Sequence, residues 1–134
     1  MTVNLPADYR PSAAEEFMNP LQVEYFRRKL LQLRADAQRE LDALPHQVGA
    51  DDSIREGDQA DQASAAVDRE FDIVNRGRAH ALLHQVDRAL ARIDNGTYGY
   101  CEDTGEPIGL RRLEAQPTAT LTIEAQARRE RPGT

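Results

Sequence analysis

Segment 99–105 has the outline of a zinc-binding turn but contains only one cysteine. A four-cysteine zinc site needs two C-x-x-C pairs, because four thiolates must surround the metal. Cys101 is the only cysteine of the chain, and Thr104 stands where its partner would be. Thr122 and Ala125 occupy the positions where a second pair is expected. We therefore expect no bound zinc; the simpler interpretation is a tight glycine-rich turn with an incidental cysteine.

A cluster of acidic residues forms a second group that could do chemistry. Its members are Asp51, Asp52, Glu56, Asp58 and Asp61. The simplest interpretation is a solvated acidic loop. However, Asp58 and Asp61 are three residues apart, a spacing that places both on one side of a helix start. At the end of a long arm, such carboxylates could reach a metal-bound or basic centre in a partner.

Catalysis by these acids would need more than the sequence offers. Metal-dependent hydrolysis requires further carboxylates or histidines that converge on one pocket, and His46 shows no such pairing with the acidic cluster. His80 and His84 are four residues apart on one predicted helix, which could bind a metal but also suits solvated or interhelical polar residues. No P-loop, nucleophile elbow or HExxH motif occurs. We expect no enzyme activity.

Composition limits the remaining function classes. The 134 residues include 23 acidic and 17 basic residues, only 5% aromatic residues and no tryptophan. A net charge of −6 disfavours general binding to DNA or RNA, which depends on clustered cations, and few aromatic residues argue against a large globular core. The lone cysteine excludes a disulfide framework, and no N-terminal apolar run resembles a signal peptide or a membrane span. We expect an elongated cytoplasmic protein without membrane association.

Two predicted helices position these residues. The first begins at the Asn19-Pro20 pair, an N-cap followed by proline at the first helical position, and ends before Pro45. The second runs from about 61 to 94, where the Asn95-Gly96 pair stops it. Late arginines indicate a third, short helix over about 121–131.

Apolar residues in both long segments recur in steps of three and four, which is typical of a helix with one buried face. In the first they are Val23, Phe26, Leu30, Leu33, Ala37, Leu41 and Leu44, and in the second Val67, Phe71, Val74, Leu82 or Leu83, Val86, Leu90 and Ile93. Two such stripes joined by one loop most simply bury each other as an antiparallel coiled coil, about 40 Å long. Dimerisation through the stripes is the alternative; we expect a monomer.

The predicted fold class is dominated by α-helices: a long antiparallel coiled-coil hairpin, a small zinc-finger-like but metal-free globular module, and a C-terminal helix. Segment 1–19 should pack on the module, 20–95 form the coiled coil with an acidic tip at about 45–63, 96–121 the module, and 122–134 the C-terminal helix and tail. In place of a metal, Thr104 and Thr122 could hydrogen-bond the backbone. An apolar cluster could add order, from Tyr98, Tyr100, Ile108, Leu110, Leu113 and Leu121.

Several short motifs resemble the DksA/TraR family in order and spacing. They are Phe17-Met18-Asn19-Pro20-Leu21-Gln22, Phe26-Arg27-Arg28, Asn75-Arg76 and Arg111-Arg112-Leu113-Glu114-Ala115 followed by Pro117-Thr118-Ala119. The resemblance covers roughly residues 17–124. It implies a protein that binds bacterial RNA polymerase through the secondary channel of the enzyme. It also implies altered initiation at stable-RNA and amino-acid promoters, often together with the nucleotide ppGpp.

The resemblance also implies roles for individual residues. Asp58-Gln59-Ala60-Asp61-Gln62-Ala63 matches the D-x-x-D-x-A tip motif of DksA. This match implies that Asp61 is the main effector, that Asp58 supports it and that Ala63 closely contacts the polymerase. Arg78 matches an arginine that touches the polymerase rim; a surface ion pair is the alternative.

Part of a ppGpp site is implied in the same way. Leu82 and Arg112 resemble residues of the composite site that DksA forms with the polymerase. Neutral amides replace basic family positions at Gln85, Gln116 and Gln126. Because phosphate recognition relies on charge-assisted hydrogen bonds, we expect a weaker dependence on ppGpp than a standard DksA has.

The sequence therefore predicts a zinc-independent, DksA-like transcription factor that acts on RNA polymerase without sequence-specific DNA binding. No cofactor is expected apart from ppGpp as a co-effector shared with the polymerase. One alternative is a transcript-cleavage or anti-arrest factor that uses the same channel and whose tip acids hold Mg²⁺. The other is a coiled-coil scaffold.

Overall fold

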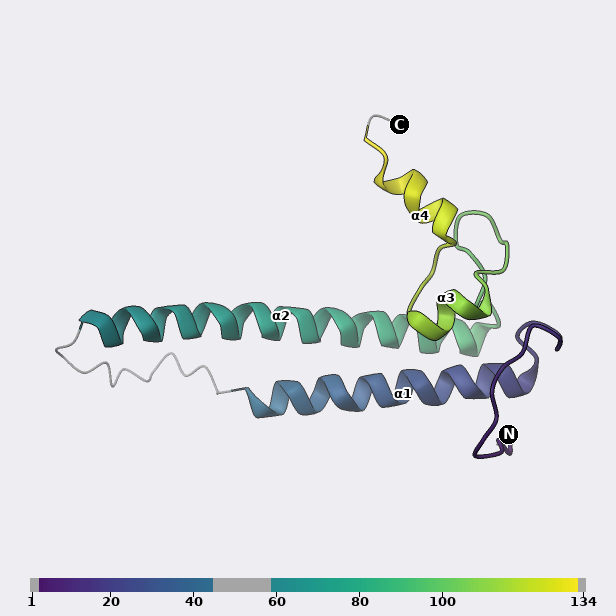
Figure 1. The fold of residues 1–134 in the computed structure, drawn as a ribbon, viewed down its shortest axis with the longest axis horizontal. Coiled ribbons are helices and arrows are strands. Elements are labelled where there is room, and N and C mark those ends of the chain that lie inside the picture. Colours follow the sequence, from purple (N-terminus) through teal and green to yellow (C-terminus); the bar gives the residue numbers. More distant parts are fainter. Residues whose placement is uncertain (1–2, 45–58, 133–134) are drawn as a thin grey trace.

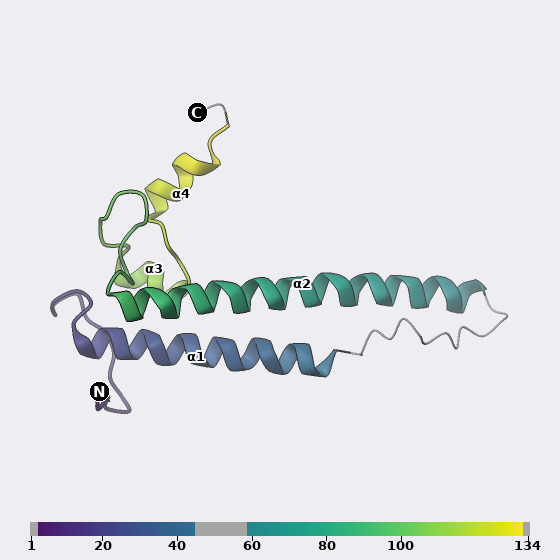
Figure 2. The same cartoon turned by 180° about the vertical axis from the view of Figure 1, so that it is seen from behind.

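Two antiparallel helices form a long hairpin, and a small module packs at one end of it (Figures 1 and 2). The computed structural model describes residues 3–44 and 59–132, with the backbone alone for 59–62. The hairpin consists of α1, Pro20–Ala43, and α2, Gln59–Asn95. In the module, α3 spans Leu110–Ala115, and α4, Ile123–Glu130, projects away from the hairpin. The predicted helical hairpin with a short C-terminal helix is confirmed.

The ends of α1 follow from the local sequence. Asn19 caps the helix, because its Oδ1 accepts a hydrogen bond from the Gln22 N–H at 2.9 Å. Gln22 Oε1 in turn accepts from the Met18 N–H at 2.8 Å. Leu44 is extended, as expected for a residue that precedes proline. No described helix combines the length and apolarity that a bilayer crossing needs.

The face of α2 that meets α1 follows a seven-residue repeat. Its members Ala79, Val86 and Ile93 are all buried or half-buried. Across the hairpin, Arg34 Nε lies 3.1 Å from Asp87 Oδ1, which fixes the antiparallel register. Because the helices are antiparallel, a step of nine residues forward from Arg34 to Ala43 corresponds to nine residues back from Asp87 to Arg78. The end of α1 therefore lies near Arg78 of α2.

Three apolar residues of α2 were predicted to lie in this contact, and for them the prediction is wrong. Val67, Phe71 and Val74 are 51%, 63% and 57% exposed. They fall outside the seven-residue repeat and therefore point to another side of the helix than Ala79. Apolar residues in steps of three and four occur both on the face of α2 that meets α1 and on the exposed face. The spacing alone therefore could not tell which of the two faces is buried.

One hydrophobic core joins the base of the hairpin to the module. Its buried members are Phe26, Leu30, Val86, Ala89, Tyr98, Cys101, Ile108, Leu113, Ala119, Leu121 and Ala125. Of the predicted apolar cluster, Leu110 packs half-buried against this core. Tyr100 instead meets Phe17 edge-on, with ring centroids 5.5 Å apart. Two long helices and the module thus share a single core.

Truncation of Phe26 to alanine should destabilise the protein strongly. Phe26 is fully buried, and such truncations cost about 3–5 kcal/mol of the free energy of unfolding. Phe71→Ala removes the same atoms from an exposed position and should cost less than about 1 kcal/mol. Urea denaturation followed by circular dichroism measures both. Equal losses would contradict the placement of Phe71 outside the core.

Candidate functional site

The residues predicted to act lie at widely separated places along the molecule. Asp58 lies outside the described residues, and Asp61 is in the first turn of α2, where only the backbone is described. Ala63 follows on α2 and is exposed, as is Arg78 near the end of α1. Cys101 and the other zinc-site positions lie in the module, at the opposite end of α2 (Figure 1).

The four positions of the zinc site come together around one sulfur atom. Cys101 is 3% exposed, and its Sγ accepts a hydrogen bond from the Thr122 N–H at 3.4 Å. Thr122 Oγ1 lies 3.8 Å from the same sulfur and accepts from the Ala125 N–H at 3.1 Å, so Thr122 also caps α4. Thr104 Oγ1 accepts from the Glu106 N–H at 3.2 Å, and the Thr104 side chain also lowers the pKa of the Cys101 thiol.

These surroundings favour the thiolate form of Cys101. Burial raises the pKa of the thiol, but several hydrogen bonds together lower it more. They come from the Thr104 side chain and from the backbone N–H groups of Thr122, Thr104 and Asp103, and the pKa falls from 9.0 to about 6. The donors therefore stabilise negative charge on the sulfur, as a metal cation does in a four-thiolate site.

The donor set does not fit a structural zinc ion. Such an ion takes four ligands, mainly thiolates and imidazoles. Here Cys101 offers one thiolate, Thr104 and Thr122 offer hydroxyls engaged with backbone N–H groups, and Ala125 offers no donor. In the part of the chain that the structure describes, no three His, Cys, Asp or Glu residues are grouped to hold a metal.

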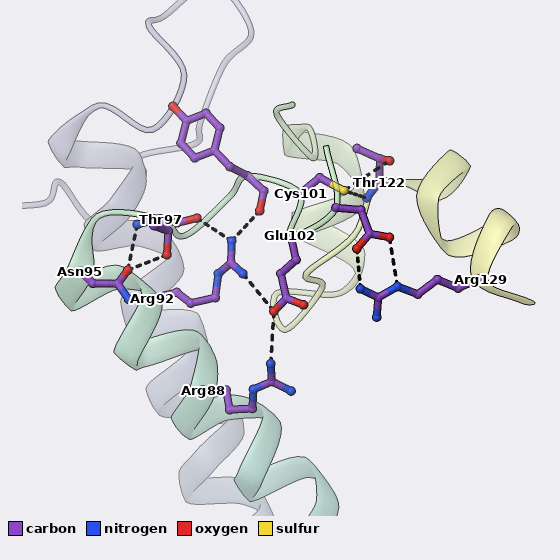
Figure 3. A network of polar contacts seen from close by, with 10 residues as sticks. Arg88, Arg92, Asn95, Thr97, Cys101, Glu102, Thr122 and Arg129 are labelled. Atoms are coloured by element: carbon purple, nitrogen blue, oxygen red, sulfur yellow. Dashed lines mark hydrogen bonds and ion pairs between the residues drawn. The ribbon is translucent and has the colours of Figure 1, made fainter. Parts of the chain in front are cut away.

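Ion pairs tie the module to α2 beside this cysteine (Figure 3). Arg92 Nη1 lies 3.1 Å from Glu102 Oε1, and Arg92 Nη2 donates to the carbonyl oxygens of Thr97 at 2.8 Å and Tyr100 at 2.5 Å. Arg88, one turn earlier, reaches the same Glu102 oxygen at 3.2 Å. Two arginines of one helix therefore hold the loop that carries Cys101.

A second ion pair ties α4 to the same loop. Arg129 Nε donates to Asp103 Oδ2 at 3.0 Å, and Arg129 Nη2 donates to Asp103 Oδ1 at 2.5 Å (Figure 3). This hydrogen bonding lowers the pKa of the Asp103 carboxyl. Sequence reasoning missed both sets of pairs. The available signals were the four-residue spacing of Arg88 and Arg92, and the adjacent acids after Cys101.

The N-terminal segment reaches the module through a close backbone contact. Gly99 has φ +93, and a Cβ there would lie 2.9 Å from the Met18 side chain. Only glycine suits this position, because both the dihedral angle and the space exclude a side chain. Tyr25 and Lys29 of α1 add polar contacts, since both donate to Glu114, at 3.1 Å in each case.

A polar hollow of about 270 Å³ lies beside the module. It is lined by Gln85, Arg88, Arg112, Gln116, Thr118, Ala119, Thr120 and Gln126. The three glutamines that replace basic family positions therefore share one hollow with Arg112. Arg112 Nε donates to the Leu121 carbonyl oxygen at 2.8 Å, which holds its guanidinium in place. Leu82 packs against the core rather than lining the hollow.

Thr104→Val should raise the pKa of the Cys101 thiol, because it removes a hydrogen bond to the thiolate. Ultraviolet absorbance of the thiolate, with Cys101→Ser as the blank, should titrate near pH 6 in the wild type and higher in the variant. Since the pKa is lower in the folded chain, wild-type stability should rise from about pH 6 to about pH 9, and this gain is lost as the pH falls through 6. A wild-type midpoint near 9 would contradict this environment.

Two family models match separate parts of the chain. The one described as "DnaK suppressor protein DksA, N-terminal domain" matches residues 22–93. The one described as "Prokaryotic dksA/traR C4-type zinc finger" matches residues 96–131, although only one cysteine is present there. The first match ends near the end of α2, and the second covers the module together with α4.

Individual proteins resemble nearly the whole chain. The RNA polymerase-binding transcription factor DksA of Caulobacter vibrioides is 48% identical over 93% of this chain and 87% of its own length. That of Escherichia coli is 33% identical over 88% and 78%. The solved structure of transcription factor DksA2 from Pseudomonas aeruginosa is 41% identical, covers 90% of this chain and 91% of its own, and superposes with a TM-score of 0.74. The resemblance predicted from the motifs is confirmed, and this chain belongs to the DksA/TraR family.

Proposed function

We propose that this protein binds bacterial RNA polymerase, inserts its hairpin into the secondary channel and modulates transcription initiation. Relatives with 48% and 33% identity are named RNA polymerase-binding transcription factors. The observation that carries the proposal is the shape of the molecule: α2 has 37 residues, about 55 Å, and begins at the end of the hairpin far from the module. The protein acts in the cytoplasm, where bacterial polymerase works.

The working end in this proposal is the start of α2. Two helices side by side are only about 20–24 Å wide, so the hairpin can enter a channel that excludes a globular domain. Asp61, in the first turn of α2, is the main effector, Asp58 supports it and Ala63 contacts the enzyme. There the Asp61 carboxylate accepts hydrogen bonds from basic elements of the polymerase and competes for them with acidic, metal-binding residues of the enzyme. It acts by binding and not by catalysis.

Independence from zinc is the second part of the proposal. The module has one thiolate where a zinc site needs four ligands. Its order is supported by the shared core, by N–H groups around Cys101 and by the Arg92 and Arg129 ion pairs. In this proposal the protein is a monomer and holds its module on the hairpin without a metal.

Asp61→Asn should abolish most of the repression that the wild type exerts at a ribosomal RNA promoter. The test is multi-round transcription by purified polymerase, with the factor pre-treated with a chelator, alongside a direct measurement of binding. Asp61→Asn should still bind. Asp68→Asn makes the same charge change at an exposed position seven residues along α2 and should repress like the wild type.

Each other outcome has a definite meaning. Equal repression by wild type and Asp61→Asn would place the effector elsewhere. Loss of wild-type activity after chelation would contradict zinc independence. Failure to bind polymerase would leave the coiled-coil scaffold, and cleavage of RNA in a stalled complex would favour the transcript-cleavage alternative.

We also propose a weakened ppGpp site at the polar hollow, completed by the polymerase. The support is that Gln85, Gln116 and Gln126 line it with Arg112, so neutral amides face a ligand that carries phosphates. Replacing Gln85 and Gln126 by lysine should lower the ppGpp concentration for half-maximal effect about tenfold or more, because a hydrogen bond to a charged group is worth about 1.5–3 kcal/mol. A ppGpp titration in the transcription assay measures this.

The control for the ppGpp experiment is Gln38→Lys, which adds the same charge on an exposed part of α1. It should leave the ppGpp response unchanged. If the wild type already responds to ppGpp as strongly as a standard DksA, the weakened site is refuted.

A further inference from the structure

Three apolar residues on the outer half of α2 form an exposed ridge. Val67, Phe71 and Val74 are spaced i, i+4 and i+7, so they share one face of the helix, and each is more than half exposed. We name these three residues the apolar ridge. Ala63 and Arg78, four residues before and after it, extend the same face and are exposed as well.

The apolar ridge does not belong to the contact between α1 and α2. At about 100° per residue, Phe71 and Val74 lie about 80° and 140° around the helix axis from Ala79, the buried residue of the contact. The half-buried Asp72 lies in line with Ala79. The ridge also lies beyond the end of α1, which is near Arg78.

The size of the apolar ridge argues against a second copy of the chain as its partner. From their exposed fractions, the three side chains present about 300 Å² of apolar surface. A stable dimer buries about 800 Å² on each partner. The ridge is thus too small to hold a dimer by itself but large enough to form one part of a larger interface.

We propose that the apolar ridge packs into an apolar groove between helices of RNA polymerase, on the wall of the channel that admits the hairpin. This inference rests on the proposed function and assigns it a further contact surface. Ala63 and Arg78, the two α2 residues already proposed to touch the enzyme, are about 22 Å apart along the helix, and the ridge fills the face between them. Anchors at i, i+4 and i+7 are the pattern by which one helix fits an apolar groove.

In this proposal, different residues of α2 determine the affinity for polymerase and the effect on transcription. Burial of apolar side chains supplies affinity, whereas charged groups mainly supply orientation and specificity. The apolar ridge should therefore govern how tightly the hairpin is held. Asp61 should govern what the bound hairpin does to transcription.

The test replaces two ridge residues with glutamine, a good helix former, in the full-length protein. Phe71→Gln with Val74→Gln should raise the Kd for purified polymerase, measured by biolayer interferometry, about tenfold or more. At concentrations that saturate the polymerase, the double variant should still repress, unlike Asp61→Asn. The matched control is Ile73→Gln, because Ile73 is 58% exposed but lies about 160° from Phe71 and about 100° from Val74 around the axis of α2. Its Kd should change less than about twofold.

The remaining outcomes distinguish failure of the ridge contact from failure of the proposed function. If the wild type does not bind polymerase, the proposed function fails. If it binds and the double variant binds equally well, only the ridge contact fails. A wild-type dimer that the double variant makes monomeric in sedimentation would identify a second copy as the occupant. A much lower thermal midpoint for the double variant than for Ile73→Gln would show that the ridge is packed within the chain itself.

Discussion

At the base of the hairpin, the sulfur of Cys101 is buried in a core that both long helices share, and its surroundings favour the thiolate form. Cys101 lies among apolar side chains, where a charge is costly unless donors surround it. The N–H groups that compensate it belong to the turn and to the start of α4, so these elements must stay in place for the core to close. Packing and charge compensation therefore enforce the same arrangement of the module.

The ion pairs contribute orientation more than stability. Exposed pairs such as that of Arg88 with Glu102 are worth at most about 1 kcal/mol each. Arg92 differs, because its side chain is only 16% exposed and it also bonds two carbonyl oxygens. It fixes the angle at which the loop leaves α2. The module thus keeps one position on the arm.

The sequence predicted some parts of this structure better than others for physical reasons. The start of α1 was predictable because Asn19 and Pro20 are local signals, whereas α3 has only six residues, too few to show a periodicity. The side of α2 that Phe71 occupies depends on the phase of the contact with α1, which spacing alone does not give. Family spacing predicted that Thr122 stands at the position of a zinc-binding cysteine. The acids after Cys101 signalled an ion pair, but the choice of Arg129 as the partner of Asp103 depends on three-dimensional placement.

Around Cys101, order is distributed over many small contacts, and this affects how the module can change in evolution. In a four-ligand metal site the loss of one ligand can release the metal and unfold the domain, so intermediates are poorly tolerated. A module held by packing and hydrogen bonds loses stability in steps of about 0.5–3 kcal/mol per substitution. Its loops can therefore drift gradually, and new surface properties can arise without passing through an unfolded ancestor.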